Sequence, residues 1–194
     1  MLEVFITSKI RREILAKFLL TPKASFHIRD LGRMVGTEIN AVRRELMHLS
    51  DAGMLKKRHS GNRLYYETNP GFYYLNPLIK LFSCEYGLGG EILKNRESLG
   101  NIKFAMLSLE FIKGRASSRN QVDLMVVGNL NQQALESLVK KEEAFLGKEI
   151  NFMALSEDEF GFQKTRHDPL LVGALGQARV ILCGDEEKYC SFFK

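Results

Sequence analysis

Two short helical patterns that meet at a glycine constrain the fold of this chain more than any other feature. Apolar residues recur at helical spacing over 28–35 and again over 37–52, and Gly36 separates the two runs. Thr37 is a favourable N-cap for the second helix, and Gly53 is a favourable residue just beyond its end. The expected buried positions are Ile28, Leu31, Val35, Ile39, Val42, Leu46 and Leu49. Two helices joined by such a turn form a helix-turn-helix.

A basic hairpin is expected after the second of these helices, and a longer helix, over 7–20, before the first. Two strand-like runs flank Ser60-Gly61-Asn62, whose composition predicts a tight turn. We expect Leu55 and the aromatic residues to face inward and the basic residues to face outward. The outward basic residues are Lys56, Lys57, Arg58 and Arg63.

The exposed face of the helix over 37–52 carries side chains that suit the major groove of DNA. Arginine can form a bidentate contact with guanine and asparagine with adenine, and an alanine methyl can meet the methyl of thymine. We therefore assign base contacts to Thr37, Asn40, Ala41 and Arg44. We assign phosphate contacts to Arg43, Lys56, Lys57, Arg58 and Arg63, with His48 and Asn62 completing the interface.

Charge is distributed unevenly along the chain. Residues 1–80 contain 14 Lys and Arg against 7 Asp and Glu, a net charge of +7, whereas residues 81–194 have a net charge of −2. This asymmetry indicates that the first part of the chain, and not the second, faces a polyanion.

The stretch HIRDLGRMVGTEINAVRRELMHLSDAGMLKKRHSGNRLYYETN, within about residues 5–70, resembles the winged helix of bacterial and archaeal ArsR-like regulators. The resemblance implies binding to double-stranded DNA, and we expect a homodimer on two half-sites. The helices contain no cysteine pair, so metal sensing has no support. A winged helix used for protein contacts is the alternative.

Residues 71–100 are expected to connect a domain over 1–70 to a domain over 101–194. Phe72 to Leu75 are apolar or aromatic and need a surface to pack on, which indicates a structured linker. Gly87 to Gly90 are expected to form a hinge or a break between helices over about 78–84 and 91–99. These helices are candidates for a dimer interface.

The second half of the chain alternates strand and helix patterns. Strands are expected over 102–107, 122–128, 149–154 and 179–184, with a helix over 130–146 and a capped helix starting at Ser156. This order predicts a small α/β sheet domain. The expected fold class is α+β, with an N-terminal winged helix-turn-helix followed by this domain.

Residues 88–185 resemble the minimal nucleotidyltransferase domain in the order of their elements. In that family a Gly-Ser pair follows the first strand and an Asp-x-Asp pair opens the second, where the carboxylates bind Mg²⁺. Here Leu109-Glu110 occupies the first position, and Gln121-Val122-Asp123 occupies the second. Phe111 to Arg115 follows as the family's turn does, with Lys113 in it.

The departures from this family pattern indicate that the chemistry has been lost. Gln121 lacks the negative charge of a metal-binding carboxylate, and Glu110 places a negative charge where a triphosphate would bind. Asn151 occupies a possible third acidic position, so Asp123 alone is retained. The expected vestigial nucleotide site is Leu109, Glu110, Lys113, Arg115, Gln121 and Asp123.

We therefore expect a sequence-specific transcription regulator that has no catalytic residues, metal or cofactor. The second domain would serve dimerisation, binding of a small-molecule effector or binding of a partner protein. The alternative is an active nucleotidyltransferase that modifies a protein, RNA or small molecule and uses its DNA-binding domain for autoregulation. Three cysteines without metal-ligand spacing and the lack of an apolar run of about 18 residues predict a cytoplasmic protein that does not bind membranes.

Overall fold

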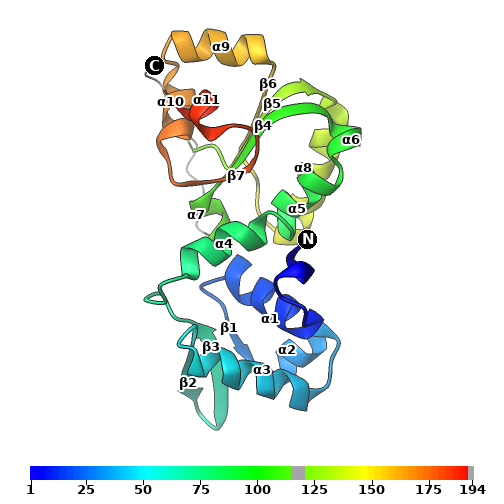
Figure 1. The fold of residues 1–194 in the computed structure, drawn as a ribbon, viewed down its shortest axis with the longest axis vertical. Helices are drawn as coiled ribbons and strands as arrows, with labels where there is room; N and C mark the ends of the chain where they lie inside the picture. Colours follow the sequence, from blue (N-terminus) through cyan, green and yellow to red (C-terminus); the bar gives the residue numbers. More distant parts are fainter. Residues whose placement is uncertain (115–120, 192–194) are drawn as a thin grey trace. The chain divides into compact units, whose positions relative to one another are not determined.

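The computed structural model describes residues 1–114 and 121–191 and shows a mixed α+β protein with two separate sheets (Figure 1). The chain forms two compact units, Met1–Phe82 and Ser83–Lys194. The expected connector over 71–100 is therefore divided between them. Within the described residues, no helix combines the length and the apolarity needed to cross a bilayer.

The first unit contains helices packed around a three-stranded antiparallel sheet of strand order β1-β3-β2. Its elements are η1 (Leu2–Val4), α1 (Lys9–Leu20), β1 (Ser25–His27), α2 (Ile28–Val35), α3 (Ile39–Asp51), β2 (Leu55–Ser60), β3 (Arg63–Thr68) and α4 (Leu75–Ser83). Its core is made of fully buried apolar side chains from the first three α-helices, namely Ile14, Phe18, Leu19, Leu31, Val42 and Leu46. The apolar faces predicted for these helices supply most of that core.

The turn between α2 and α3 is held by backbone hydrogen bonds. Gly36 adopts a left-handed conformation with φ of 64°, which favours glycine, and ends α2 as predicted. The prediction that Thr37 is the N-cap of the next helix is wrong, because Glu38 holds that position. The N–H of Thr37 donates to the carbonyl of Gly32 at 3.1 Å, so Thr37 still belongs to the turn.

Ile39, the first residue of α3, was expected to be buried but is 42% exposed. It lies at the end of the helix, where it borders an open groove rather than the core. The rest of the predicted apolar stripe of α3 is buried.

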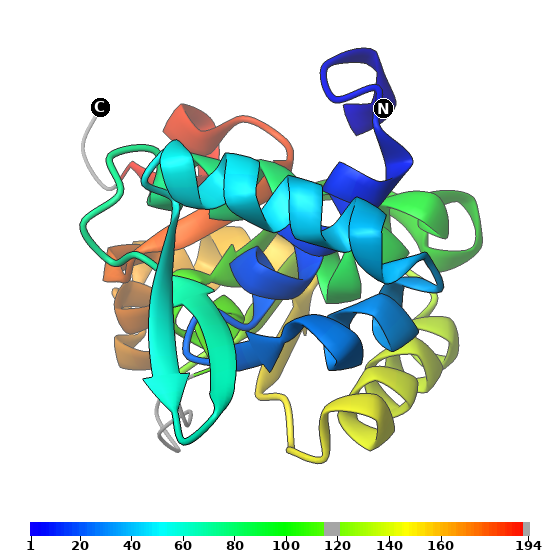
Figure 2. The same cartoon turned by 90° about the horizontal axis from the view of Figure 1, so that it is seen from below.

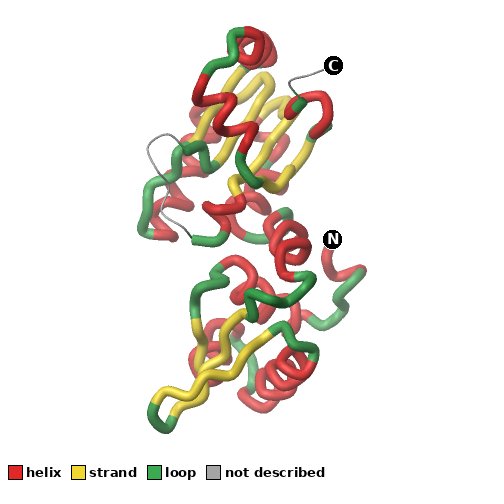
Figure 3. Tube along the Cα trace, turned by 90° about the vertical axis from the view of Figure 1, so that its left-hand side faces the viewer, coloured by secondary structure: helices red, strands yellow, loops and turns green. Residues whose placement is uncertain are grey.

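The hairpin has the predicted position, and it extends beyond the helices of its unit (Figure 2 and Figure 3). Ser60 pairs with Arg63, so Gly61 and Asn62 form a two-residue turn. The short strand β1 was not predicted. It pairs with β3 in antiparallel fashion and is too short to show a strand pattern in sequence.

The second unit is built on a four-stranded sheet of order β6-β5-β4-β7, in which β5 and β6 are parallel and the other pairs antiparallel. Its strands are β4 (Gly100–Ser108), β5 (Leu124–Leu130), β6 (Phe152–Leu155) and β7 (Arg179–Cys183). Its helices are α5 (Gly87–Lys94), α6 (Arg96–Leu99), α7 (Leu109–Ile112), α8 (Gln132–Leu146), α9 (Glu157–Thr165), α10 (Pro169–Gly176) and α11 (Glu186–Cys190).

Helices cover both faces of this sheet (Figure 1). On one face, α9, α10 and α11 pack over Phe104, Met106, Met125 and Val127 in a continuous apolar cluster. Tyr189 of α11 stacks on Phe104 with ring centroids 4.8 Å apart. On the other face, α5 lies against the sheet and α8 packs beside α5.

The glycine cluster over 87–90 is not a hinge or a break, since it forms the first turn of α5. A Cβ atom on Gly89 would lie 2.1 Å from the carbonyl oxygen of Ser83, and one on Gly90 would lie 2.4 Å from that of Glu85. Glycine therefore permits close backbone packing here. The helix predicted over 91–99 is two helices, α5 and α6, which meet at Asn95.

Phe145 of α8 is apolar but 78% exposed. It lies near the C-terminal end of that helix. Leu135 and Val139, earlier in the helix, are the positions that the fold buries.

Candidate nucleic-acid interface and the Asp123 cluster

The solvent-facing side of α3 presents polar and basic residues from its first turn onward. Asn40, Arg43, Arg44 and His48 are exposed, whereas Ala41 is half-buried. Met47, which the sequence reasoning missed, is 49% exposed. It follows Arg44 by three residues and Asn40 by seven, so the three share one face of the helix. An apolar side chain there can meet a thymine methyl better than the half-buried Ala41.

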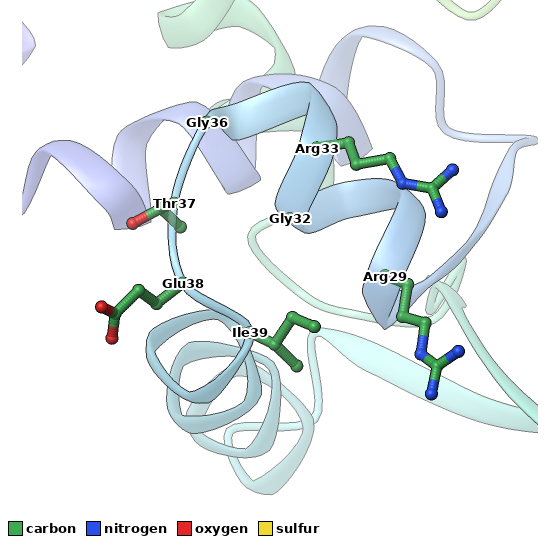
Figure 4. Close-up of a pocket in the computed structure, with 7 residues that line it drawn as sticks. All are labelled: Arg29, Gly32, Arg33, Gly36, Thr37, Glu38 and Ile39. Atoms are coloured by element: carbon green, nitrogen blue, oxygen red, sulfur yellow. The ribbon is translucent and has the colours of Figure 1, made fainter.

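Two arginines of α2 extend this surface. Arg29 and Arg33 are exposed one turn apart and border a shallow groove between α2 and the start of α3 (Figure 4). Arg33 also pairs with Asp30 at 3.8 Å in an exposed position. Neither arginine was assigned a role from sequence. Their spacing of four residues on a short amphipathic helix does indicate that both lie on one face of it.

The basic residues of the hairpin do not share one outward face, contrary to the prediction. Successive side chains of a strand point to opposite faces of the sheet. Lys57 is paired with the buried Tyr66, whereas Lys56 is paired with Glu67 and lies on the opposite face. Three consecutive basic side chains on β2 therefore cannot contact the same phosphate backbone from one side.

Arg58 is held within its own unit. Its Nε lies 3.4 Å from the Glu67 carboxylate, its Nη2 donates to Ser25 Oγ at 3.1 Å, and its guanidinium lies 5.6 Å from the centre of the Tyr65 ring. Arg63 and Asn62, at the tip of the hairpin, are exposed. The tip is thus better placed for contacts outside the unit than Arg58 is.

Lys57 and Arg43 lie on elements that pack against each other, β2 and α3. Both residues are exposed. Lys57 is the direct pairing partner of Tyr66 on β3. Burial raises the pKa of Tyr66, and the positive charge of Arg43 opposes this rise.

In the second unit, Asp123 is buried, with 1% of its surface exposed, and is enclosed by backbone hydrogen bonds. Its Oδ2 accepts from the N–H of Asn151 at 3.0 Å, and its own N–H donates to the Asn151 carbonyl at 2.7 Å. Its carbonyl accepts from the N–H of Ser108 at 2.8 Å. Gln121 reaches the same region, with its Nε2 donating to Ser108 Oγ at 3.4 Å. The expected neighbours Gln121, Asp123 and Asn151 are thus brought together.

A positive charge is present beside this carboxylate. The Nζ of Lys148 lies 4.2 Å from the centre of the Phe111 ring and 3.5 Å from the Phe111 carbonyl oxygen. Burial lowers the pKa of Lys148, and the negative charge of Asp123 opposes that change. Sequence reasoning missed Lys148, which lies 25 residues from Asp123 in a loop without a motif.

The segment that was compared with the Gly-Ser pair of nucleotidyltransferases, starting at Leu109, is a short helix, α7, which Ser108 caps. The N–H of Leu109 donates to the Ala178 carbonyl at 2.8 Å, and its side chain is buried rather than directed into a cradle. Glu110 and Lys113 are half-exposed at either end of this helix. Arg115 lies outside the described residues. Among the residues that are described, no group of three or more His, Cys, Asp and Glu side chains could hold a metal ion.

Comparison with known protein families, with curated proteins and with solved structures finds no match to this chain.

Proposed function

We propose that this protein is a sequence-specific DNA-binding transcription regulator. In this proposal the unit Met1–Phe82 is a winged helix-turn-helix that inserts α3 into the major groove and places the hairpin β2–β3 against the DNA backbone. The protein binds as a homodimer to two half-sites.

The observation that carries the proposal is the face of α3. Asn40 and Arg44 are exposed one turn apart in the first half of a helix that follows a tight turn. These are the side chains that recognise adenine and guanine in bidentate fashion. The N-terminal half of a recognition helix is also the part that reaches base edges.

Positive charge around α3 supports the same proposal. Arg29 and Arg33 on α2, Arg43 on α3 and Lys57 on β2 are exposed, and both α2 and β2 pack against α3. We assign these four to phosphate contacts. Such contacts supply most of the sequence-independent affinity and orient the protein on the duplex.

For the second unit we propose a nucleotidyltransferase-like fold without catalysis, which serves dimerisation, effector sensing or partner binding. The support comes from Asp123, which is buried and hydrogen-bonded to backbone, and from Gln121, whose amide is neutral. A hydrated Mg²⁺ prefers exposed carboxylates and keeps several waters. The ammonium of Lys148 also supplies a local positive charge beside Asp123.

Selection of binding sites from randomised double-stranded DNA, using the full chain, tests the first part of the proposal. We expect an enriched motif with two related half-sites, and enrichment of no motif would refute DNA recognition. Calorimetry with Mg²⁺ and each nucleoside triphosphate tests the second part. We expect no Mg²⁺-dependent binding, and tight binding would favour an active enzyme instead.

A further inference from the structure

We infer that Glu38 is a base-reading residue that selects a C·G base pair, its carboxylate accepting a hydrogen bond from the cytosine amino group in the major groove. This inference rests on the proposed DNA-binding function, and it adds a specificity-determining residue to it.

Glu38 is the N-cap residue of α3, with an extended backbone of φ −65° and ψ 141°, and its side chain makes no capping hydrogen bond to the helix. The residue is exposed. Glu38 is one of the residues that line the groove bordered by Arg29 and Arg33, and Figure 4 shows its carboxylate pointing away from the side chains of Ile39 and of these arginines. The carboxylate is therefore directed outward at the leading end of the helix.

This position is adjacent to the other proposed base contacts. Glu38 precedes Asn40 by two residues and Arg44 by six. Two residues of helix advance about 3 Å along the axis and turn about 200° around it, so the two side chains leave the helix on different sides. Successive base pairs are about 3.4 Å apart. The N-terminal end of a recognition helix is the part that reaches base edges, so Glu38, at that end, is placed to contact a base pair next to the one that Asn40 contacts.

The chemistry of the groove edges selects cytosine for a carboxylate. Cytosine presents only its N4 amino donor there, whereas guanine presents two acceptors and thymine presents one. Adenine offers an amino donor, but its N7 acceptor lies beside that donor and repels a second acceptor group. A carboxylate therefore gains at cytosine and is repelled most strongly at guanine.

An acidic residue at this position is unfavourable in the DNA complex unless it finds such a donor. In the free protein, the net charge of +7 over residues 1–80 and the exposed arginines on α2 and α3 attract the carboxylate. Close to DNA, a carboxylate is repelled by the phosphates. Glu38 consequently lowers affinity for DNA in general and raises discrimination among sequences.

A competing role for Glu38 is stabilisation of α3, because negative charge is favourable near a helix N-terminus. That role predicts a lower melting temperature in a neutral variant and an unchanged preference for bases. The two roles are separated by measuring both quantities on the same variants.

The test is site selection from randomised DNA, followed by binding titrations on the selected sites, for the full chain and for Glu38→Gln and Glu38→Ala. Circular dichroism and melting curves show whether each variant is folded. For the native protein we expect a C·G pair next to the base pair whose preference is lost in Asn40→Ala. In Glu38→Ala that preference should weaken by about five- to tenfold, corresponding to one directional hydrogen bond. In Glu38→Gln it should shift toward adenine, the base that glutamine recognises.

If both variants keep the native motif, including its preference at that pair, Glu38 reads no base and the inference is overturned while the proposed function stands. If the native chain enriches no motif at all, the proposed function fails and this inference fails with it. The native selection alone therefore distinguishes the two failures.

Discussion

Arg11 on α1 and Glu45 on α3 are joined by two parallel hydrogen bonds, from Nε to Oε2 at 2.7 Å and from Nη2 to Oε1 at 3.3 Å. The Glu45 side chain is 17% exposed and that of Arg11 is 36% exposed. Paired N–H donors of this kind fix the angle of the guanidinium as well as its distance. The pair ties α3 to α1 on the side of α3 that faces the core.

We predict a coupling energy of about 1–2 kcal/mol between these two residues, less than for a fully buried pair because solvent screens Arg11. Arg11→Ala, Glu45→Ala and the double variant, unfolded by urea, give this energy as a double-mutant cycle. Asp30 and Arg33, exposed and 3.8 Å apart, form the control pair, for which we expect coupling near zero. If the two pairs had equal coupling energies, the Arg11–Glu45 pair would stabilise the fold no more than the exposed pair does, and the prediction would be wrong.

Arg44→Ala should weaken binding to the selected site by about 1–3 kcal/mol and relax the preference at one base pair. Its effect on random DNA should be small, because the lost contact is to a base edge. Titrations on the selected site and on a scrambled duplex measure both. A loss of the same size on the two duplexes would mean that Arg44 senses only charge.

Lys57→Ala should weaken binding to every sequence and lower the salt dependence by about 0.9 in the slope of log K against log salt. Arg58→Ala is the matched control on the same strand. Its guanidinium is already engaged by Glu67 and Ser25, so we expect a smaller change. Titrations at several salt concentrations test this order, and an equal or larger effect of Arg58→Ala would contradict it.

Asp123→Ala should destabilise the second unit by about 1–3 kcal/mol, because the part-buried N–H of Asn151 loses its acceptor. Asp123→Asn keeps an acceptor oxygen and should cost less. Both variants remove the charge that opposes the lowering of the Lys148 pKa, so this pKa should fall further in each. Chemical denaturation and NMR titration of the lysine side chain measure these effects, and an unchanged Lys148 pKa would show that the two charges do not interact.

Glu159 should make the stability of the second unit depend on pH in acid. Hydrogen bonds from the backbone and the hydroxyl of Ser156 lower its pKa from the ordinary value of 4.5. The contribution of Glu159 to the free energy of unfolding is then fully present above pH 4.5. It is lost as the pH falls through the lower pKa of the folded state. Melting curves of the native chain and of Glu159→Ala should differ at neutral pH and converge in acid. A difference that persists below the folded-state pKa would rule out the charged capping box as its source.

Several local features were predicted correctly because neighbouring residues decide them. The limits of α2, its end at Gly36, the position of the hairpin turn and the capped helix start at Ser156 each depend on side chains within a few residues of one another. The mixed α+β class also followed from the spacing of apolar residues. These features need no knowledge of distant partners.

Other features escaped prediction because distant residues decide them. The strand β1 exists only because β3 pairs with it, and the glycines over 87–90 are helical because the backbone of Ser83 and Glu85 lies against them. In the candidate interface, Met47 is exposed because no other element among the described residues covers that face of α3. Arg58 on β2 is engaged by Glu67, which lies on the neighbouring strand β3.

The sequence by itself determined which residue types are available: an asparagine and arginines on one amphipathic helix, a basic hairpin, and a lone aspartate where a metal-binding pair is expected. The tertiary structure alone decided how these residues are used. It divided the hairpin lysines between two faces and buried Asp123 against the backbone of Asn151, with the charge of Lys148 nearby. The physical reason is that helical and strand periodicity act over a few residues, whereas burial, hydrogen-bond satisfaction and charge pairing depend on which distant segments the fold brings together.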